Sequence, residues 1–159
     1  MKYNIDHKKD KVIIKNIFDF HPKHIFECGQ CFRWNIEEDG SYTIVAYGKV
    51  LNVKKLDNDI ILSNTNLEDF TNIWINYFDL NKDYLLIKKE LSKDPILKEA
   101  IKFGQGIRIL NQEPYETLIS FIISANNQIP RIKKAVELIA VDLGEYAGSW
   151  NGRDYFAFP

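Results

Sequence analysis

The spacing of apolar residues divides the chain into a first part with the short period of strands and a second part with the longer period of helices. Three runs of β-branched and aromatic residues fall within 41–64, where Gly48 and "DND" separate them, and "KVIIKNI" at 11–17 precedes them. Short runs bounded by turn residues are typical of an antiparallel meander. "EEDG" at 37–40 marks a further turn, after the strand-like segment "CFRWNI".

From Thr65 onward apolar residues recur three and four positions apart, which predicts helices. Thr65 and Glu68 fit a capping box before "NLEDFTNIWINYF". Asn81 is the predicted cap of "NKDYLLIKKELSK", and Asp94 that of "DPILKEAIKFG", which Gly104 ends. Two more helices are predicted over "EPYETLISFIISA" and "NQIPRIKKAVELIAVDLG". The first of these two has almost no polar face, so we expect it inside a helical core.

Strands followed by helices indicate the α+β class with segregated elements. We expect an antiparallel β-sheet domain over residues 1–75 and an α-helical domain over 76–159, with a soft boundary between 65 and 80. The sequence contains no internal repeats and no low-complexity tracts. One ordinary domain, or one domain plus part of another, is what a chain of 159 residues allows.

The charge of the chain limits the classes of partner. The formal net charge is −1, without a long block of one sign, so attraction to nucleic acid must come from a local patch. No apolar run approaches the roughly 18 residues of a membrane-spanning helix. The first residues, "MKYNIDHKKDKVIIKN", lack the apolar core of a signal peptide. We therefore expect a soluble intracellular protein, in the cytoplasm or nucleoid, without a membrane partner.

Cys28 and Cys31 form the C-x-x-C of "CGQC". A thioredoxin-like redox site needs this motif at the start of a helix, where the first thiol is acidified. Here "FRWNIEEDG" follows, which predicts a strand and a turn, so redox chemistry is the weaker alternative. The three histidines precede the cysteines at no recognised ligand spacing. We expect no metal site and no cofactor.

The stretch "FIISANNQIPRIKK" at 121–134 joins an apolar helix to a cluster of cations. Asn127, Arg131 and Lys134 share one stripe of the last predicted helix. A cation in the first turn opposes the helix dipole unless an anion binds there, and Asn and Arg are frequent readers of base edges. The alternative interpretation makes Asn127 an N-cap and Arg131 a solvated surface residue.

Four segments together resemble the 8-oxoguanine DNA glycosylase family. They are "CGQCFRW" (28–34), "YFDL" (77–80), "FGQGIRILNQEPYETLISFIISANNQIPRI" (103–132) and the terminal "YFAFP". The resemblance implies a twisted sheet like half of the TATA-binding protein, followed by a helix-hairpin-helix glycosylase domain. It also implies base-excision repair of duplex DNA containing 8-oxoguanine. A DNA glycosylase/AP lyase of this family cleaves the N-glycosidic bond and then β-eliminates through a lysine Schiff base.

The resemblance assigns roles to four residues. Asn126, Asn127 and Arg131 match the family residues at the gap left by the everted base, with Arg131 on the orphaned cytosine. Gly29 matches the glycine whose main-chain carbonyl faces the extruded base. N7 of 8-oxoguanine carries a hydrogen and donates, whereas N7 of guanine accepts, so one carbonyl oxygen attracts the lesion and repels the normal base. Phe32 and Trp34 are expected in the core, and Arg33 is expected to order its surroundings.

The catalytic lysine and aspartate of the family have no counterpart in the sequence. No Leu-Pro-Gly-x-Gly-x-Lys stretch occurs, so we assign no catalytic residue. The chain resembles the N-terminal portion of such an enzyme, and we expect it to be inactive alone. Exposed apolar surface should then cause self-association or marginal stability. A non-catalytic DNA- or protein-binding module is the alternative function.

Overall fold

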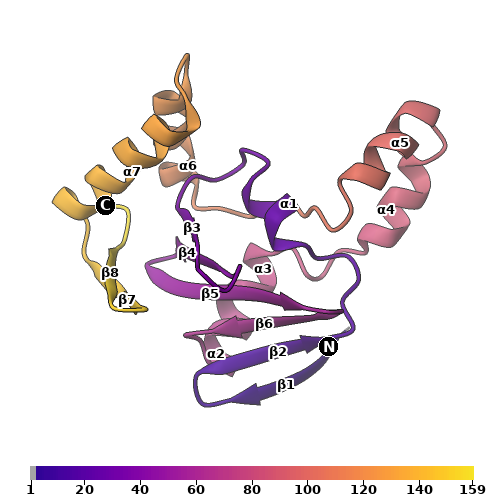
Figure 1. Cartoon of the computed structure of the whole chain (residues 1–159), viewed down its shortest axis with the longest axis horizontal. Helices are drawn as coiled ribbons and strands as arrows, with labels where there is room; N and C mark the ends of the chain where they lie inside the picture. Colours follow the sequence, from indigo (N-terminus) through magenta and orange to yellow (C-terminus); the bar gives the residue numbers. More distant parts are fainter. Residues whose placement is uncertain (1–2) are drawn as a thin grey trace.

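The structure, a computed structural model, describes residues 3–159 and is built on a six-stranded antiparallel sheet (Figure 1). All strands predicted in the first part are present, and one more, β1, lies at an edge of the sheet. In sheet order the strands are β1 (Asn4–Lys8), β2 (Lys11–Lys15), β6 (Asp59–Ser63), β5 (Lys49–Leu56), β4 (Tyr42–Ala46) and β3 (Trp34–Ile36).

The strand register aligns apolar side chains across the sheet. Val12 is opposite Leu62, Leu62 is opposite Val53, and Val53 is opposite Tyr42. All four side chains are buried. Because a slip by one residue would turn such a row toward solvent, burial of this face fixes the register.

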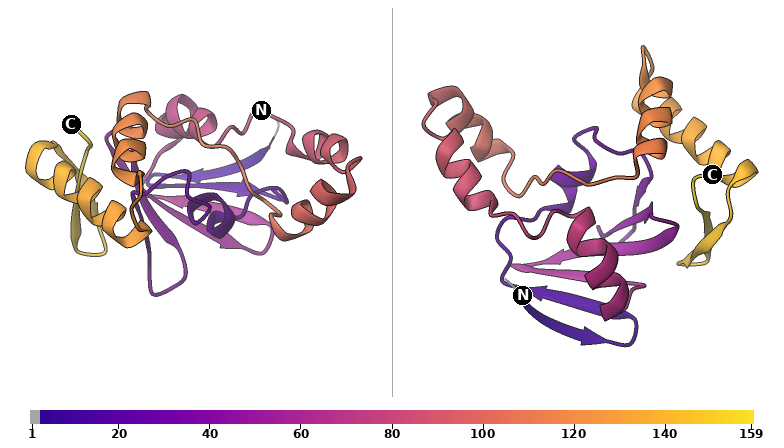
Figure 2. Two further views of the ribbon diagram at one scale, coloured as in Figure 1. Left: turned by 90° about the horizontal axis from the view of Figure 1, so that it is seen from above. Right: turned by 180° about the vertical axis from the view of Figure 1, so that it is seen from behind.

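A continuous helical run covers the sheet in the view from behind (Figure 2). It consists of α2 (Leu67–Asp69), the π-helical turn η1 (Phe70–Trp74) and α3 (Ile75–Tyr77). The Phe70 and Trp74 side chains are fully buried in the main core, together with Ile25 and Phe26 of the short helix α1 (Pro22–Phe26). The run crosses residue 75 without a break, and the division at that residue stays a prediction.

Two helical hairpins lie at opposite ends of the molecule, and all three views agree on this arrangement (Figures 1 and 2). One hairpin is α4 (Tyr84–Leu91) with α5 (Pro95–Phe103), and the other is α6 (Pro114–Ser124) with α7 (Ile129–Leu143). Within residues 3–159, no helix combines the length and apolar character needed to cross a bilayer.

The predicted placement of α6 inside a helical core is wrong for this chain. Only Ser120 of the helix is buried, and Leu118, Phe121 and Ile122 are each at least half exposed. Helix α6 packs against α7 on one side. Its remaining apolar surface faces solvent, which agrees with the predicted exposure of apolar surface.

The observed N-caps differ from the predicted ones at three helices and agree with the prediction at one. Asn66, not Thr65, caps α2 by accepting from the Asp69 amide at 2.9 Å. Asp83, not Asn81, caps α4, and Gln128, not Asn127, is the N-cap position of α7. Asp94 caps α5 as predicted, with its carboxylate accepting from the Ile96 and Leu97 amides, and Gly104 follows the helix.

A second small sheet, which the sequence reading missed, follows α7. Strands β7 (Tyr146–Trp150) and β8 (Arg153–Phe156) form a hairpin that packs on β5. Tyr155 is buried there with Val45 and Val50 of the large sheet. The turn dipeptide Asn151-Gly152, with φ values of 49° and 75°, is a strong hairpin signal that predicts this element.

Candidate nucleic-acid interface

Gly29 lies in the loop between α1 and β3, in the left-handed region with φ of 87°. A side chain at this position would meet nothing within 4 Å, so the space beside the residue is open. Across residues 3–159 no hydrogen-bond donor reaches the Gly29 carbonyl. The loop therefore presents a main-chain acceptor that is free to bind a ligand donor.

Phe32 connects this loop to the α6–α7 hairpin. Its buried ring packs with Ile132 and Val136 of α7, and its centroid lies 6.2 Å from that of Phe121 in α6. This is the predicted core role for Phe32. Trp34 is half-buried against the main core, and the Lys133 ammonium lies 3.4 Å from its ring centroid.

The turn between α6 and α7 carries the two predicted amides, and the predicted guanidinium, that of Arg131, lies in the first turn of α7. Asn126 is exposed and adopts a φ of 51°, a conformation that Asn tolerates better than most residues. Asn127 bridges the two helices, since its amide donates to the Ile123 carbonyl at 3.1 Å and accepts from the Gln128 amide at 2.9 Å. The exposed Arg131 side chain has no hydrogen-bond or ion-pair partner in residues 3–159.

The Gly29 loop and the α6–α7 turn project from the same edge of the molecule. In Figure 1 both lie above the sheet, and the view from behind gives the same arrangement (Figure 2). The Phe32 contacts join the Gly29 loop to α6 and α7, the helices that flank the turn. The structure thus brings the four predicted site residues to one edge, with the acceptor on one segment and the amides and guanidinium on the other.

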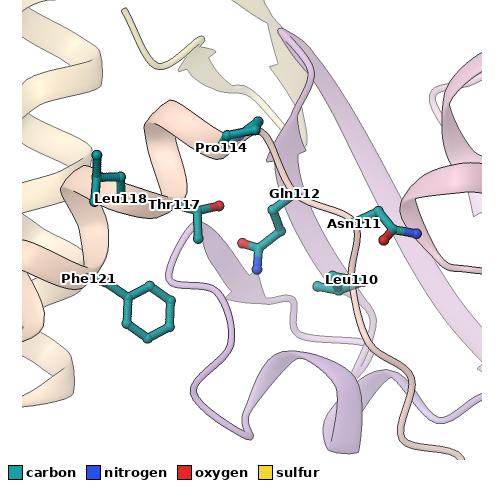
Figure 3. Close-up of a pocket in the computed structure, with 7 residues that line it drawn as sticks. All are labelled: Leu110, Asn111, Gln112, Pro114, Thr117, Leu118 and Phe121. Carbon is teal, nitrogen blue, oxygen red and sulfur yellow. The ribbon is translucent and has the colours of Figure 1, made fainter.

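An open groove of about 550 Å³ lies along α6 and the segment that precedes it. Figure 3 shows Gln112, Thr117 and Phe121 directed into this space, next to the loop between α1 and β3. The Gln112 amide donates to the Gln30 carbonyl at 2.5 Å. The groove is therefore continuous with the loop that carries Gly29.

A buried group of charges lies behind the loop. Arg33 donates to the Phe156 carbonyl, and its guanidinium is 4.0 Å from both Glu116 and Glu137. Burial raises the pKa of Glu116 to about 7, although the nearby Arg33 guanidinium lowers it. Arg33 orders β3, α6 and the C-terminal hairpin together, as predicted.

The two cysteines lack the surroundings of a redox site. Both are free, Cys28 is exposed, and burial raises the pKa of Cys31 far above its ordinary value. They lie in a loop and not at the helix start that a thioredoxin-like site requires. Within residues 3–159, no group of three or more His, Cys, Asp and Glu side chains is arranged to hold a metal.

Sequence reasoning missed the contribution of Gln30, Gln112 and Glu116 to this edge. Each is partly buried and polar, and each contacts a segment distant in the sequence. Their signal in the sequence is a polar residue next to apolar or glycine positions, as in "CGQC" and "ILNQEPYE". That signal does not identify the partner, because the partner comes from another part of the chain.

Comparisons with known proteins agree on one family. The model for "8-oxoguanine DNA glycosylase, N-terminal domain" matches residues 12–118. N-glycosylase/DNA lyase OGG1 of Arabidopsis thaliana is 30% identical over 146 residues, which cover 84% of this chain and 38% of that protein. The N-glycosylase/DNA lyase of Saccharomyces cerevisiae is 49% identical over 55 residues, or 35% of this chain and 15% of that protein.

Solved structures share the fold over the whole chain. MBOgg1 in complex with a low affinity DNA ligand has a TM-score of 0.95 at 58% identity, and the match covers 100% of this chain and 55% of that one. The Clostridium acetobutylicum 8-oxoguanine glycosylase/lyase, in complex with DNA containing cytosine opposite 8-oxoG, has a TM-score of 0.95 at 51% identity, with coverage of 100% and 55%. The chain spans about half the length of these proteins. The expected α+β fold is confirmed.

Proposed function

Since the chain belongs to the 8-oxoguanine DNA glycosylase family, we propose that it is the lesion-reading portion of a base-excision repair enzyme, a DNA glycosylase/AP lyase. Its partner is double-stranded DNA containing 8-oxoguanine. The observation that carries the proposal is the unpartnered Gly29 carbonyl at the same edge as the Asn126–Arg131 turn. An everted base and its orphaned partner need recognition groups at two adjacent points, and this edge offers both.

Gly29 is the proposed reader of the lesion. The carbonyl accepts the N7 hydrogen of 8-oxoguanine, whereas N7 of guanine is itself an acceptor and repels it. The open space at Gly29 supports this role, because a base must approach the main chain closely. The lesion gains one hydrogen bond where guanine meets a repulsion, so we expect the affinity for the lesion to be about tenfold higher.

The α6–α7 turn is the proposed reader of the opposite strand. The exposed Arg131 guanidinium, which has no partner in residues 3–159, donates to the orphaned cytosine. Asn126 occupies the gap left by the everted base, and Asn127 holds the turn between the helices through its bonds to Ile123 and Gln128. These donors are planar, which suits base edges.

The proposed division of labour separates recognition from chemistry. A sheet domain over 1–75 supplies Gly29, and a helical domain over 76–159 supplies the turn with Arg131. No lysine of the chain lies in the family's catalytic motif. We therefore expect no lesion excision by this chain and no borohydride-trapped adduct with 8-oxoguanine duplex, and a trapped adduct would contradict that expectation.

Fluorescence anisotropy with labelled duplexes tests the proposal. The chain should bind a duplex with 8-oxoguanine opposite cytosine about tenfold more tightly than an undamaged duplex. Arg131→Ala should abolish the preference for cytosine over adenine opposite the lesion. Lys134→Ala, which removes an exposed cation one turn further along the same helix, should weaken binding to every duplex equally. Equal affinity of the unsubstituted chain for all duplexes would overturn the proposal.

A further inference from the structure

The Gln30 side chain connects the Gly29 loop to a distant segment through both ends of its amide. The amide nitrogen donates to the Ile25 carbonyl at 2.9 Å and to the Arg108 carbonyl at 2.8 Å. The amide oxygen accepts from the Leu110 N–H at 2.9 Å. The Gln30 main-chain carbonyl also accepts from Gln112. One residue thus makes four hydrogen bonds, three of them to a segment about eighty residues away.

That segment, the connector between α5 and α6 (residues 104–113), is itself firmly held. The fully buried Arg108 side chain donates to the carbonyls of Asp19 and Asp79, both at 2.8 Å. The Asn111 side chain donates to the Asn76 carbonyl at 2.7 Å, and the Asn111 carbonyl accepts from the Tyr47 hydroxyl at 2.7 Å. Gln30 therefore attaches the loop to a part of the core that does not move easily.

Gly29 itself contributes no such restraint. The adjacent residue Gln30 makes four hydrogen bonds, whereas no bond to the Gly29 carbonyl is formed within residues 3–159. Glycine has the greatest conformational freedom of all residues, so its carbonyl direction must be set by its neighbours. Cys28, on the other side, supplies a weak bond from its thiol to the Ile25 carbonyl at 3.3 Å.

We propose that Gln30 is a positioning residue that fixes the direction of the Gly29 carbonyl, and through it the discrimination between 8-oxoguanine and guanine. This inference rests on the proposed role of Gly29. Gln30 does not touch the base. It holds the peptide that follows Gly29 against the connector, so that the carbonyl oxygen meets the N7 hydrogen at the required angle.

The first test compares the affinity ratio for lesion and undamaged duplexes. Gln30→Ala should reduce the ratio from about tenfold to near one while affinity for the undamaged duplex changes less than about twofold. Asn111→Ala is the matched control, because it removes a side-chain bond from the same connector to α3 and not to the loop. It should lower stability and leave the ratio unchanged. A wild-type ratio in Gln30→Ala would overturn the inference.

The second test uses Gln30→Glu, which keeps the shape and changes the hydrogen-bond donors. A carboxylate at this position faces the Ile25 and Arg108 carbonyls without a proton to donate. A protonated carboxyl regains one donor and keeps an acceptor for the Leu110 N–H. Discrimination by this variant should be lost at about pH 8 and partly recovered at about pH 5, whereas the unsubstituted chain should discriminate at both. Equal discrimination by the variant at the two pH values contradicts the inference.

A third readout does not depend on DNA. Cys28 is exposed and Cys31 is half-buried, so a disulfide reagent should modify one thiol quickly and the other slowly. Gln30→Ala should speed the slow thiol at least about tenfold, since the loop loses its attachment, and Asn111→Ala should not. An unchanged slow rate in Gln30→Ala would overturn the attachment of the loop by Gln30. If instead the unsubstituted chain shows no preference for the lesion in the binding assay, the proposed function fails, whatever the thiol rates are.

Discussion

Glu116 illustrates how one side chain at this edge responds to its surroundings. The carboxyl is only 18% exposed, and the Arg33 guanidinium lies 4.0 Å from it, beyond hydrogen-bonding distance. Burial of the charged form is therefore incompletely compensated, which accounts for a pKa of about 7. The neighbouring Glu113 raises the pKa further.

We expect the stability of the protein to fall as pH rises from about 4.5 to about 7, because of Glu116. In that window the unfolded chain has already lost the proton that the folded chain keeps. The shift corresponds to a free energy on the order of 3 kcal/mol. Urea unfolding at several pH values should show this fall in the unsubstituted chain and a flatter profile in Glu116→Gln. Parallel profiles for the two proteins would refute the assignment.

Gly29→Ala should remove the preference for the lesion. The new methyl group enters the open space beside the carbonyl, and the left-handed backbone becomes strained. Gly40→Ala is the matched control, since Gly40 also has a positive φ and open space but lies in the turn before β4. Both variants should lose about 1 kcal/mol of stability. Only the variant at residue 29 should bind lesion and undamaged duplex equally in the anisotropy assay.

At the scale of elements, sequence patterns predict most strands and helices but not all of their boundaries. Asp94 and Gly104 bound α5 correctly because each has one physical role there and no nearby competitor. At the start of α2, Thr65 and Asn66 are both able to cap. The choice falls to Asn66 because Thr65 is buried and accepts from the Trp74 indole at 2.8 Å. Tertiary packing therefore determines where α2 begins, and the local sequence pattern carries no information on that packing.

Thr65→Val should therefore destabilise the protein through Trp74. The substitution keeps the volume and removes the acceptor, so a buried N–H loses its partner at a cost of about 1–3 kcal/mol. Thr71→Val is the control, because the exposed Thr71 hydroxyl bonds only to the Leu67 carbonyl of its own helix. That change should stay within about 0.5 kcal/mol. Urea midpoints measure both, and equal losses would contradict the assigned role of Thr65.

The candidate site was predictable only in part for a related reason. Gly29, Asn126, Asn127 and Arg131 lie in short local motifs, and the family resemblance is enough to propose them as site residues. Gln30 acts through Arg108 and Leu110, which are about eighty positions away. No local period predicts such a contact, so the support of the loop becomes visible only in three dimensions.

At the scale of the whole molecule, the apolar surface of the helical hairpins is unusually extensive. Large apolar side chains of α4, α5, α6 and α7 are more than two-fifths exposed, and they include Leu85, Leu86, Ile96, Phe103, Leu118, Phe121, Ile122 and Leu143. Most soluble domains expose such residues singly. Relatives that share this fold are nearly twice as long, since the chain covers 55% of them.

We expect the isolated chain to associate with itself through these surfaces. Sedimentation velocity should show a weight-average mass that rises with concentration. Leu118→Lys together with Ile122→Lys should shift the distribution toward monomer, because both side chains belong to the exposed face of α6. Leu56→Lys changes a single exposed apolar residue at the β5–β6 turn and should leave it unchanged. A monomer at all concentrations would contradict this expectation.

The C-terminal hairpin has a mechanical consequence for recognition. Helix α7 carries Arg131 in its first turn and is followed by the β7–β8 hairpin, which packs on β5. Phe32 packs against the same helix through Ile132 and Val136. The packing thus sets the separation between the two proposed reading points, Gly29 and Arg131, in the free protein. DNA is stiff, so bending and unstacking cost an energy that depends on the base pairs being deformed, and contacts with the protein must repay that cost. If the proposed function holds, such a protein should favour base pairs that unstack at low cost, in addition to bases that carry a hydrogen on N7.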